Sequence, residues 1–87
     1  MINFDNYNYD YKIIDNQLII IDITGLTTMN DNIEFVVDYL IDKHNTGFGR
    51  VYVRDYKKCW FVYDYKNEVQ QPINESEEKW LNEIDWR

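Results

Sequence analysis

The chain has 87 residues, of which 16 are acidic and 9 basic, and its formal net charge is -7. This length allows one domain, residues 1–87, and the single cysteine and single histidine exclude an internal disulfide, a cysteine-type zinc site and a multi-histidine metal site. No apolar run approaches the roughly 20 residues that span a bilayer, and the first residues lack a signal-peptide pattern, so we expect a soluble, intracellular protein without a cofactor.

Two strands are predicted at the start of the chain. Residues 7–15 alternate with period two, which is typical of a half-buried strand, and place Tyr7, Tyr9, Tyr11 and Ile13 on one face. Asp15-Asn16 is a candidate tight turn. The apolar residues at 18–21 and 23 then predict a central strand that is covered on both faces.

The spacing changes after a glycine-containing loop at 24–28. Apolar residues recur at intervals of three and four and predict a helix from about residue 31 to about residue 43, capped by Asn30 or Thr28. Its apolar face contains Ile33, Val36, Val37, Leu40 and Ile41. The segment 44–49 ends this helix with two glycines.

A second pair of strands is predicted at 51–56 and 59–65. Lys57-Lys58 is the expected two-residue turn, and a four-residue turn over 55–58 is the alternative. Both turns place the same side chains on each face, whereas a loop of odd length would change which residues are neighbours. One face is then expected to hold Tyr52, Arg54, Tyr56, Cys59, Phe61, Tyr63 and Tyr65, and the other Val51, Val53, Asp55, Trp60, Val62 and Asp64.

Residues 67–74 read as a loop, and Asn74 can cap a second helix over about 75–85. Trp80, Leu81 and Ile84 form the apolar stripe of that helix, while Trp86 is a candidate exposed aromatic. The order of elements is therefore ββαββα. The simplest architecture is an α+β domain in which one antiparallel sheet carries both helices on one face.

Carboxylates form the first candidate functional surface. Side chains four residues apart on a helix stand about 5–6 Å apart, close to the spacing of phosphates along a nucleic-acid strand. A carboxylate row could therefore imitate a nucleic-acid backbone and bind a basic protein, although most such rows are only solvated helix faces. The residues of this candidate acidic surface are Asp31, Glu34, Asp38, Asp42, Glu75 and Glu78.

The middle of the chain offers an alternative surface of opposite charge. Residues 43–66 hold six basic and two acidic side chains, whereas the flanking segments are acidic. Aromatic and basic side chains together suit base stacking and phosphate contact, although the same aromatics could form a buried sheet face. The candidate nucleic-acid surface consists of Arg50, Tyr52, Arg54, Lys57, Lys58 and Tyr63.

Three further features carry weaker indications of chemistry. His44 could take part in acid–base chemistry, but its position at a helix end favours a capping role. Cys59 is interpreted as a small core residue rather than a nucleophile. The loop 47–50 leads into a strand instead of a helix and is interpreted as a flexible connection. We therefore predict a protein that is not an enzyme.

In size, acidity, Asn- and Tyr-rich composition and α+β pattern, the chain resembles small phage-encoded anti-defence proteins of the anti-CRISPR and anti-restriction type. The resemblance covers the whole chain and implies an inhibitor that occupies the nucleic-acid site of a CRISPR effector or other defence nuclease in the bacterial cytoplasm. The alternatives are a nucleic-acid or nucleotide-binding module that uses the hairpin 50–65, and a self-associating structural protein. A monomer or a homodimer is expected, with no membrane partner.

Overall fold

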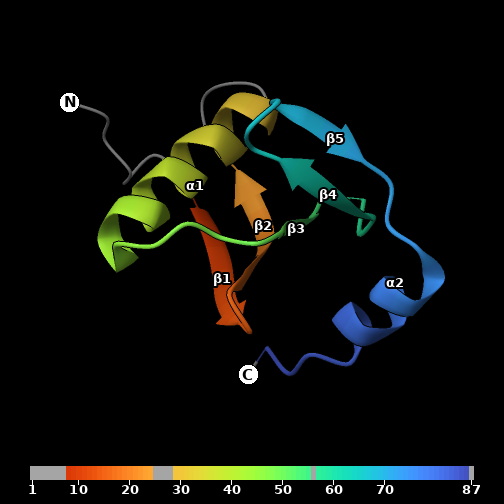
Figure 1. Cartoon of the computed structure of the whole chain (residues 1–87). Coiled ribbons are helices and arrows are strands. Elements are labelled where there is room, and N and C mark those ends of the chain that lie inside the picture. The colour runs from red at the N-terminus through yellow and green to blue at the C-terminus, as the bar shows by residue number, and fades with distance from the viewer. Residues whose placement is uncertain (1–7, 25–28, 56, 87) are drawn as a thin grey trace.

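The computed structural model describes residues 8–24, 29–55 and 57–86. Five strands form one mixed sheet in the order β1-β2-β3-β4-β5, with two helices (Figure 1). The elements in chain order are β1 (Asn8–Ile14), β2 (Gln17–Thr24), α1 (Met29–His44), β3 (Val51–Arg54), β4 (Trp60–Asp64), β5 (Val69–Gln71) and α2 (Glu75–Asn82). The predicted order ββαββα is wrong, because a fifth strand precedes the second helix.

The first hairpin forms as predicted. Ile14 pairs with Gln17 across the two-residue turn, in which Asp15 and Asn16 have φ values of 51° and 62°. Positive φ at both positions is the requirement of a type I′ turn, and Asn and Asp tolerate it better than most residues. The turn therefore sets the register of residues 10–14 against residues 17–21, and the register shifts between Asn8 and Asp10.

The sheet is mixed because β2 and β3 run parallel. Leu18 pairs with Val51 and Ile20 with Val53 in this parallel ladder. Parallel neighbours need a long crossover, and α1 supplies it between the two strands. The prediction of a wholly antiparallel sheet is wrong for this reason. The interior position of β2 is confirmed, and both of its faces are buried.

The connection between β3 and β4 differs from both predicted turns. Arg54 pairs with Trp60, which leaves the five residues 55–59 between the strands. The Asp55 carboxylate accepts hydrogen bonds from the backbone N–H groups of Lys57 and Cys59, at 2.8 and 2.9 Å. Because this length is odd, Tyr52 lies opposite Val62 and not opposite a residue of the predicted aromatic face. The predicted division of side chains between the two faces is therefore wrong.

Strand β5 lies in the segment that was predicted to be a loop. Val69 pairs with Asp64 and Gln71 with Val62, so β5 forms one edge of the sheet. It is only three residues long, and none of them is buried. A short strand without an apolar alternation gives no period-two signal, which explains why the pattern did not reveal it.

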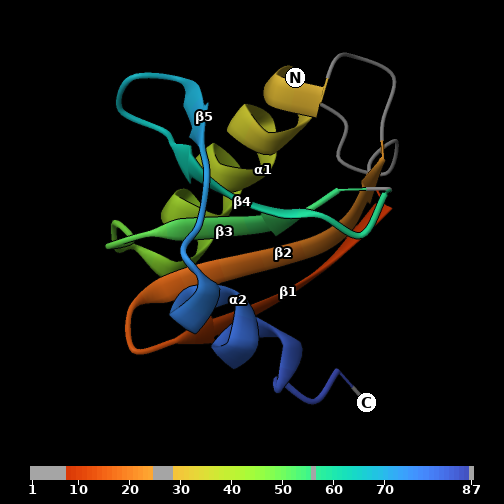
Figure 2. The ribbon, with the colours of Figure 1, turned by 90° about the vertical axis from the view of Figure 1, so that its right-hand side faces the viewer.

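The two helices lie on opposite faces of the sheet (Figure 2). Helix α1 packs on the face that holds the α1-side cluster, formed by Leu18, Ile20, Ile23, Ile33, Val36, Val37, Leu40, Phe48, Val51, Val53 and Tyr63. Helix α2 covers the other face through the α2-side cluster, formed by Ile19, Ile21, Tyr52, Trp60, Val62 and Leu81. The prediction that both helices pack on one face is therefore wrong.

Local features at the ends of the elements complete the fold. The Asn74 side chain caps α2 as predicted, accepting a hydrogen bond from the Glu77 N–H at 2.8 Å. Helix α2 ends at Asn82, but Ile84 and Trp86 continue to pack against the α2-side cluster, so Trp86 is half-buried rather than exposed. Phe48 is buried, so the segment 47–50 is anchored in the core.

Candidate functional site

Helix α1 presents acidic side chains on the side that faces away from the sheet. Asp38 and Asp42 are exposed and stand one turn apart, whereas Glu34 is half-buried. Four residues advance a helix by about 6 Å, so the two exposed carboxylates are neighbours on its surface. Asp31 belongs to α1, but its side chain lies outside the described residues. We call Glu34, Asp38 and Asp42 the α1 acidic row.

The buried stripe of α1 determines the orientation of this row. Ile33, Val36, Val37 and Leu40 are fully buried against the sheet, at the spacing of three and four that was predicted. Within the described residues, neither Asp38 nor Asp42 takes part in an ion pair. Both side chains are exposed to solvent.

A group of tyrosines lies where the edge strand β1 meets α1, with Tyr9 and Tyr11 on the strand and Tyr39 on the helix. The ring centroids of Tyr9 and Tyr11 are 5.9 Å apart, and the Tyr11 hydroxyl lies 3.3 Å from Nε2 of His44 at the end of α1. Burial and the nearby hydroxyls of Tyr39 and Tyr11 raise the pKa of Tyr9. Tyr9, Tyr11 and Tyr39 are half-buried. We call these three residues the tyrosine cluster.

The acidic residues of α2 lie apart from the α1 acidic row. Glu75 and Glu78 are exposed, but they belong to the helix on the opposite face of the sheet (Figure 2). The structure therefore divides the predicted acidic surface into two separate parts. The α1 part shares its helix with Tyr39 and His44, which lie beside Tyr9 and Tyr11 of β1.

A polar network connects the start of β3 to α2. The Glu77 Oε2 atom accepts hydrogen bonds from Arg50 Nη1 and from the Tyr52 hydroxyl, each at 2.7 Å. The Tyr52 hydroxyl is the main cause of a lowered pKa of Glu77. Burial, followed by the hydrogen bond to Glu77, raises the pKa of Tyr52 itself. No local pattern in the sequence indicates this network, because Glu77 lies 25 residues from Tyr52 and 27 residues from Arg50.

The residues of the alternative nucleic-acid surface do not come together. Tyr52 and Tyr63 are both buried and lie on opposite faces of the sheet. Arg50 contacts Glu77, and Arg54 lies over the ring of Trp60 with Nη2 at 3.6 Å from the Asp22 carboxylate. Lys58 also lies near Asp22, at 4.0 Å, and both Lys57 and Lys58 are exposed. Basic groups remain at the surface here, but without a shared aromatic platform.

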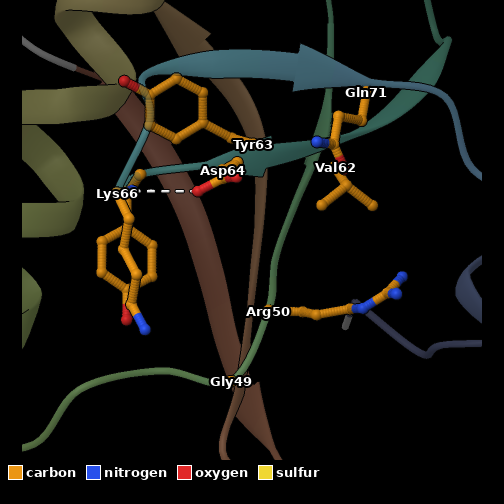
Figure 3. Close-up of a pocket in the computed structure, with 8 residues that line it drawn as sticks. Gly49, Arg50, Val62, Tyr63, Asp64, Lys66 and Gln71 are labelled. Carbon is orange, nitrogen blue, oxygen red and sulfur yellow. Dashed lines mark hydrogen bonds between the residues drawn. The ribbon is translucent and has the colours of Figure 1, made fainter.

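A small cavity lies where β3 and β4 diverge (Figure 3). Its volume is about 210 Å³, and Gly49, Arg50, Asp64, Tyr65 and Lys66 contribute to its wall. Figure 3 shows Arg50 extending away from Asp64 and Lys66, so the charged groups do not converge on one point. Shallower hollows of about 550 and 410 Å³ adjoin Tyr52 and Glu77. The cavity of about 210 Å³ is smaller than the roughly 300–1,000 Å³ of typical ligand sites.

The two residues considered for nucleophilic or acid–base chemistry are placed apart from each other in the fold. His44 is the last residue of α1 and contacts Tyr11. Cys59 is exposed in the β3–β4 connection, where its described contacts are with Asp55 and Lys57. The interpretation of Cys59 as a core residue is therefore wrong, since the odd connection removes it from the strand.

No family model, curated protein or solved structure matches this chain. Among the described residues, no group of three or more histidine, cysteine or carboxylate side chains could hold a metal ion. In the same part of the chain, neither helix is long and apolar enough to cross a membrane. The α1 acidic row and the tyrosine cluster are the candidate functional site, because they combine exposed carboxylates with half-buried aromatic side chains on the α1 side of the sheet.

Proposed function

We propose that this chain is an acidic, non-catalytic binding protein that uses the α1 acidic row and the adjoining tyrosine cluster to bind a basic protein. The observation that carries the proposal is the pair of exposed carboxylates, Asp38 and Asp42, one turn apart on the outer side of α1. Charged groups that are exposed and uncompensated accelerate encounter with an oppositely charged partner.

The tyrosine cluster adds the short-range contacts that a row of carboxylates lacks. Tyrosine buries a large area with few rotatable bonds, and it is enriched where interfaces have their strongest contacts. Tyr9, Tyr11 and Tyr39 are only half-buried, so a partner seated on α1 can cover their remaining surface. Charge and aromatic contact area therefore lie together on the α1 side of the molecule.

A nucleic-acid-handling protein is the partner that this surface fits best. Such a protein has a basic groove shaped for phosphates, and carboxylates one helical turn apart can occupy it without being cleaved. Binding of this kind would block the nucleic-acid site of a defence nuclease or CRISPR effector. The alternative of direct nucleic-acid binding by the hairpin 50–65 has less support. Its two candidate stacking residues, Tyr52 and Tyr63, are buried on opposite faces of the sheet.

The test is a pull-down from a nuclease-treated lysate of a low-GC bacterium, followed by competition with duplex DNA. We expect one basic protein to be retained and then released by the duplex. The variant Asp38→Lys/Asp42→Lys should weaken this retention at least about tenfold, because each reversal replaces an attraction with a repulsion.

The matched control is Glu75→Lys/Glu78→Lys, which makes the same change of charge on the opposite face of the sheet. Retention of the partner by the control, together with its loss from the α1 variant, supports the proposal. Equal loss from both would show that net charge alone governs binding. Retention by the α1 variant would remove the α1 acidic row from the interface.

A further inference from the structure

Strand β1 leaves one edge of the sheet open within the described residues. It is the first strand in the sheet order, and no described strand pairs with its outer side. It is seven residues long and contains no proline. The opposite edge is formed by β5, which has three residues and is followed directly by Pro72. A long unpaired edge is a template for another strand, and short edges and prolines discourage such pairing.

The turn determines which backbone groups of β1 point outward. In a two-residue type I′ hairpin the flanking pair, here Ile14 and Gln17, is a hydrogen-bonded pair, and such pairs alternate along an antiparallel ladder. Lys12 and Asp10 therefore direct their N–H and C=O groups toward β2. Tyr11 and Ile13 direct theirs away from the sheet, toward an incoming strand.

We propose that the chain forms a twofold-symmetric homodimer by antiparallel pairing of the two β1 edges, with Tyr11 opposite Tyr11 of the partner subunit. In this register the two Tyr11 residues exchange both backbone hydrogen bonds. Tyr9 lies opposite Ile13 of the partner subunit. On the other side of the twofold axis, Ile13 lies opposite Tyr9 of the partner subunit. The proposal does not depend on the proposed function.

Charge complementarity selects this register among the neighbouring ones. With Tyr11 at the axis, Asp10 lies opposite Lys12 of the partner subunit, and the pair occurs twice. A symmetric register with Asp10 at the axis would place two aspartates opposite each other, and one with Lys12 at the axis would place two lysines together. Like charges directly opposite destabilise a sheet, whereas opposite charges stabilise it.

The other face of β1 offers apolar contacts in the same register. Ile13 is one of two large hydrophobic residues that are exposed in the described part of the chain, and 37% of its surface is accessible. Tyr9 and Tyr11 are half-buried and lie on the same face as Ile13. Pairs of aromatic and β-branched residues stabilise adjacent strands, so dimerisation covers Ile13 with Tyr9 of the partner subunit.

The expected dimer is a continuous ten-stranded sheet. The twofold axis of such a pairing is perpendicular to the sheet, so both copies of α1 lie on the same side. Two α1 acidic rows would then flank the axis, which doubles the acidic surface available to one partner. Only this last consequence depends on the proposed function.

The first test measures the mass of the protein by analytical ultracentrifugation from roughly 1 µM to 1 mM. We expect a reversible monomer–dimer equilibrium. The variants Asp10→Lys and Lys12→Asp should each raise the dimer dissociation constant about tenfold or more, because either change creates two like-charge pairs. The controls Glu68→Lys and Lys66→Asp make the same charge changes at the β4–β5 turn and should leave the constant within about threefold of the wild type.

Mixing the two single variants tests the charge pairing directly. An equimolar mixture of the Asp10→Lys and Lys12→Asp proteins should form a heterodimer, because opposite charges face each other again in both pairs. The double variant Asp10→Lys/Lys12→Asp should recover self-association. A dimer dissociation constant that does not change with these substitutions would overturn the proposed interface. A wild-type protein that stays monomeric throughout the concentration range would overturn the proposed dimer.

Hydrogen exchange on the wild-type protein provides a test without substitutions. The amides of Tyr11 and Ile13 should gain protection as the protein concentration rises. The Lys12 amide faces β2 and should stay protected at all concentrations. If all three amides show no dependence on concentration, the β1 edge is not the interface.

Discussion

Glu77 connects helix α2 to the sheet through specific side-chain hydrogen bonds. Its carboxylate accepts one hydrogen bond from Tyr52 and one from Arg50, and it thereby joins α2 to β3. Because the folded-state pKa of Glu77 lies below its unfolded value, its contribution to stability is present above the unfolded pKa. That contribution is lost as the pH falls through the folded pKa.

At this scale we predict the effect of Tyr52→Phe. Removal of the hydroxyl takes away the main cause of the lowered Glu77 pKa, so that pKa should rise toward the ordinary value of a glutamate. The free energy of unfolding at neutral pH should fall by about 1 kcal/mol, since one side-chain hydrogen bond is lost and solvent at the partly exposed Glu77 reduces the added effect of its charge.

A carboxyl-detected NMR titration of Glu77 measures the first effect, and urea unfolding at neutral pH measures the second. Asp64 serves as an internal reference, because its pKa is lowered mainly by a hydrogen bond from the Asn67 side chain. An unchanged Glu77 pKa in the variant would show that Tyr52 does not hold the carboxylate in solution.

Among the elements, α2 depends most on its own ends. It has eight residues, which is below the length at which isolated helices are stable in water. Asn74 caps its first turn, the acidic residues of that turn complement the helix dipole, and Leu81 is its one buried residue. The Trp60 indole N–H also donates a hydrogen bond to Asn82 at 2.9 Å. Few contacts thus hold this helix to the sheet.

We predict that Asn74→Ala lowers the free energy of unfolding by about 1 kcal/mol, the usual cost of losing an N-cap. The reason is that the Glu77 N–H loses the side-chain acceptor 2.8 Å away. Thermal unfolding followed by circular dichroism measures the change, and Asn74→Ser, which retains a capping oxygen, is the control. Equal stability of the alanine variant and the wild type would exclude a capping contribution.

The elements also show what the sequence could and could not indicate. The hairpin 8–24 and both helices could be located, because alternation, turn residues and the spacing of three and four are local signals. The five-residue connection between β3 and β4 could not be located from the sequence. It depends on the Asp55 carboxylate, which accepts hydrogen bonds from the N–H groups of Lys57 and Cys59. The connection is one residue longer than the predicted four-residue turn over 55–58. This difference changed which residues lie beside Tyr52 and divided the predicted aromatic surface between the two faces of the sheet.

The arrangement of the helices was partly indicated by the sequence. The apolar run of β2 predicted a strand covered on both faces, and α2 provides the cover on the face that two helices on one side would have left to solvent or a partner. The parallel pairing of β2 with β3 left no local signal, because it depends on how α1 crosses over the sheet. At the candidate site, the α1 acidic row was predicted, whereas the position of Tyr9 and Tyr11 of β1 beside Tyr39 and His44 of α1 required the tertiary structure.

At the scale of the whole molecule, the sheet separates two clusters of buried side chains. Ile33 is fully buried in the α1-side cluster, and Ile19 is fully buried in the α2-side cluster. Residues in different clusters share no packing partners, so substitutions in them should act independently. The fold therefore has two thin cores instead of one thick core.

We predict that Ile33→Val and Ile19→Val each lower the free energy of unfolding by about 0.5–1.5 kcal/mol. The double variant should lose the sum of the two effects, within about 0.5 kcal/mol. Urea unfolding of the four proteins completes the cycle. A coupling energy well above that limit would mean that the two faces repack together through the sheet.

The distribution of aromatic residues between the two faces has a spectroscopic consequence. All three tryptophans, Trp60, Trp80 and Trp86, belong to the α2-side cluster or pack against it, whereas Tyr9, Tyr11, Tyr39, Tyr63 and Tyr65 belong to the α1 side. Tryptophan emission therefore reports the solvent exposure of one face of the sheet. Occupation of α1 by a partner would leave that emission nearly constant while it alters the tyrosine absorbance. Tyr52 is the one described tyrosine of the α2-side cluster, so tryptophan emission labels the α2 side, and tyrosine absorbance reports mainly the α1 side.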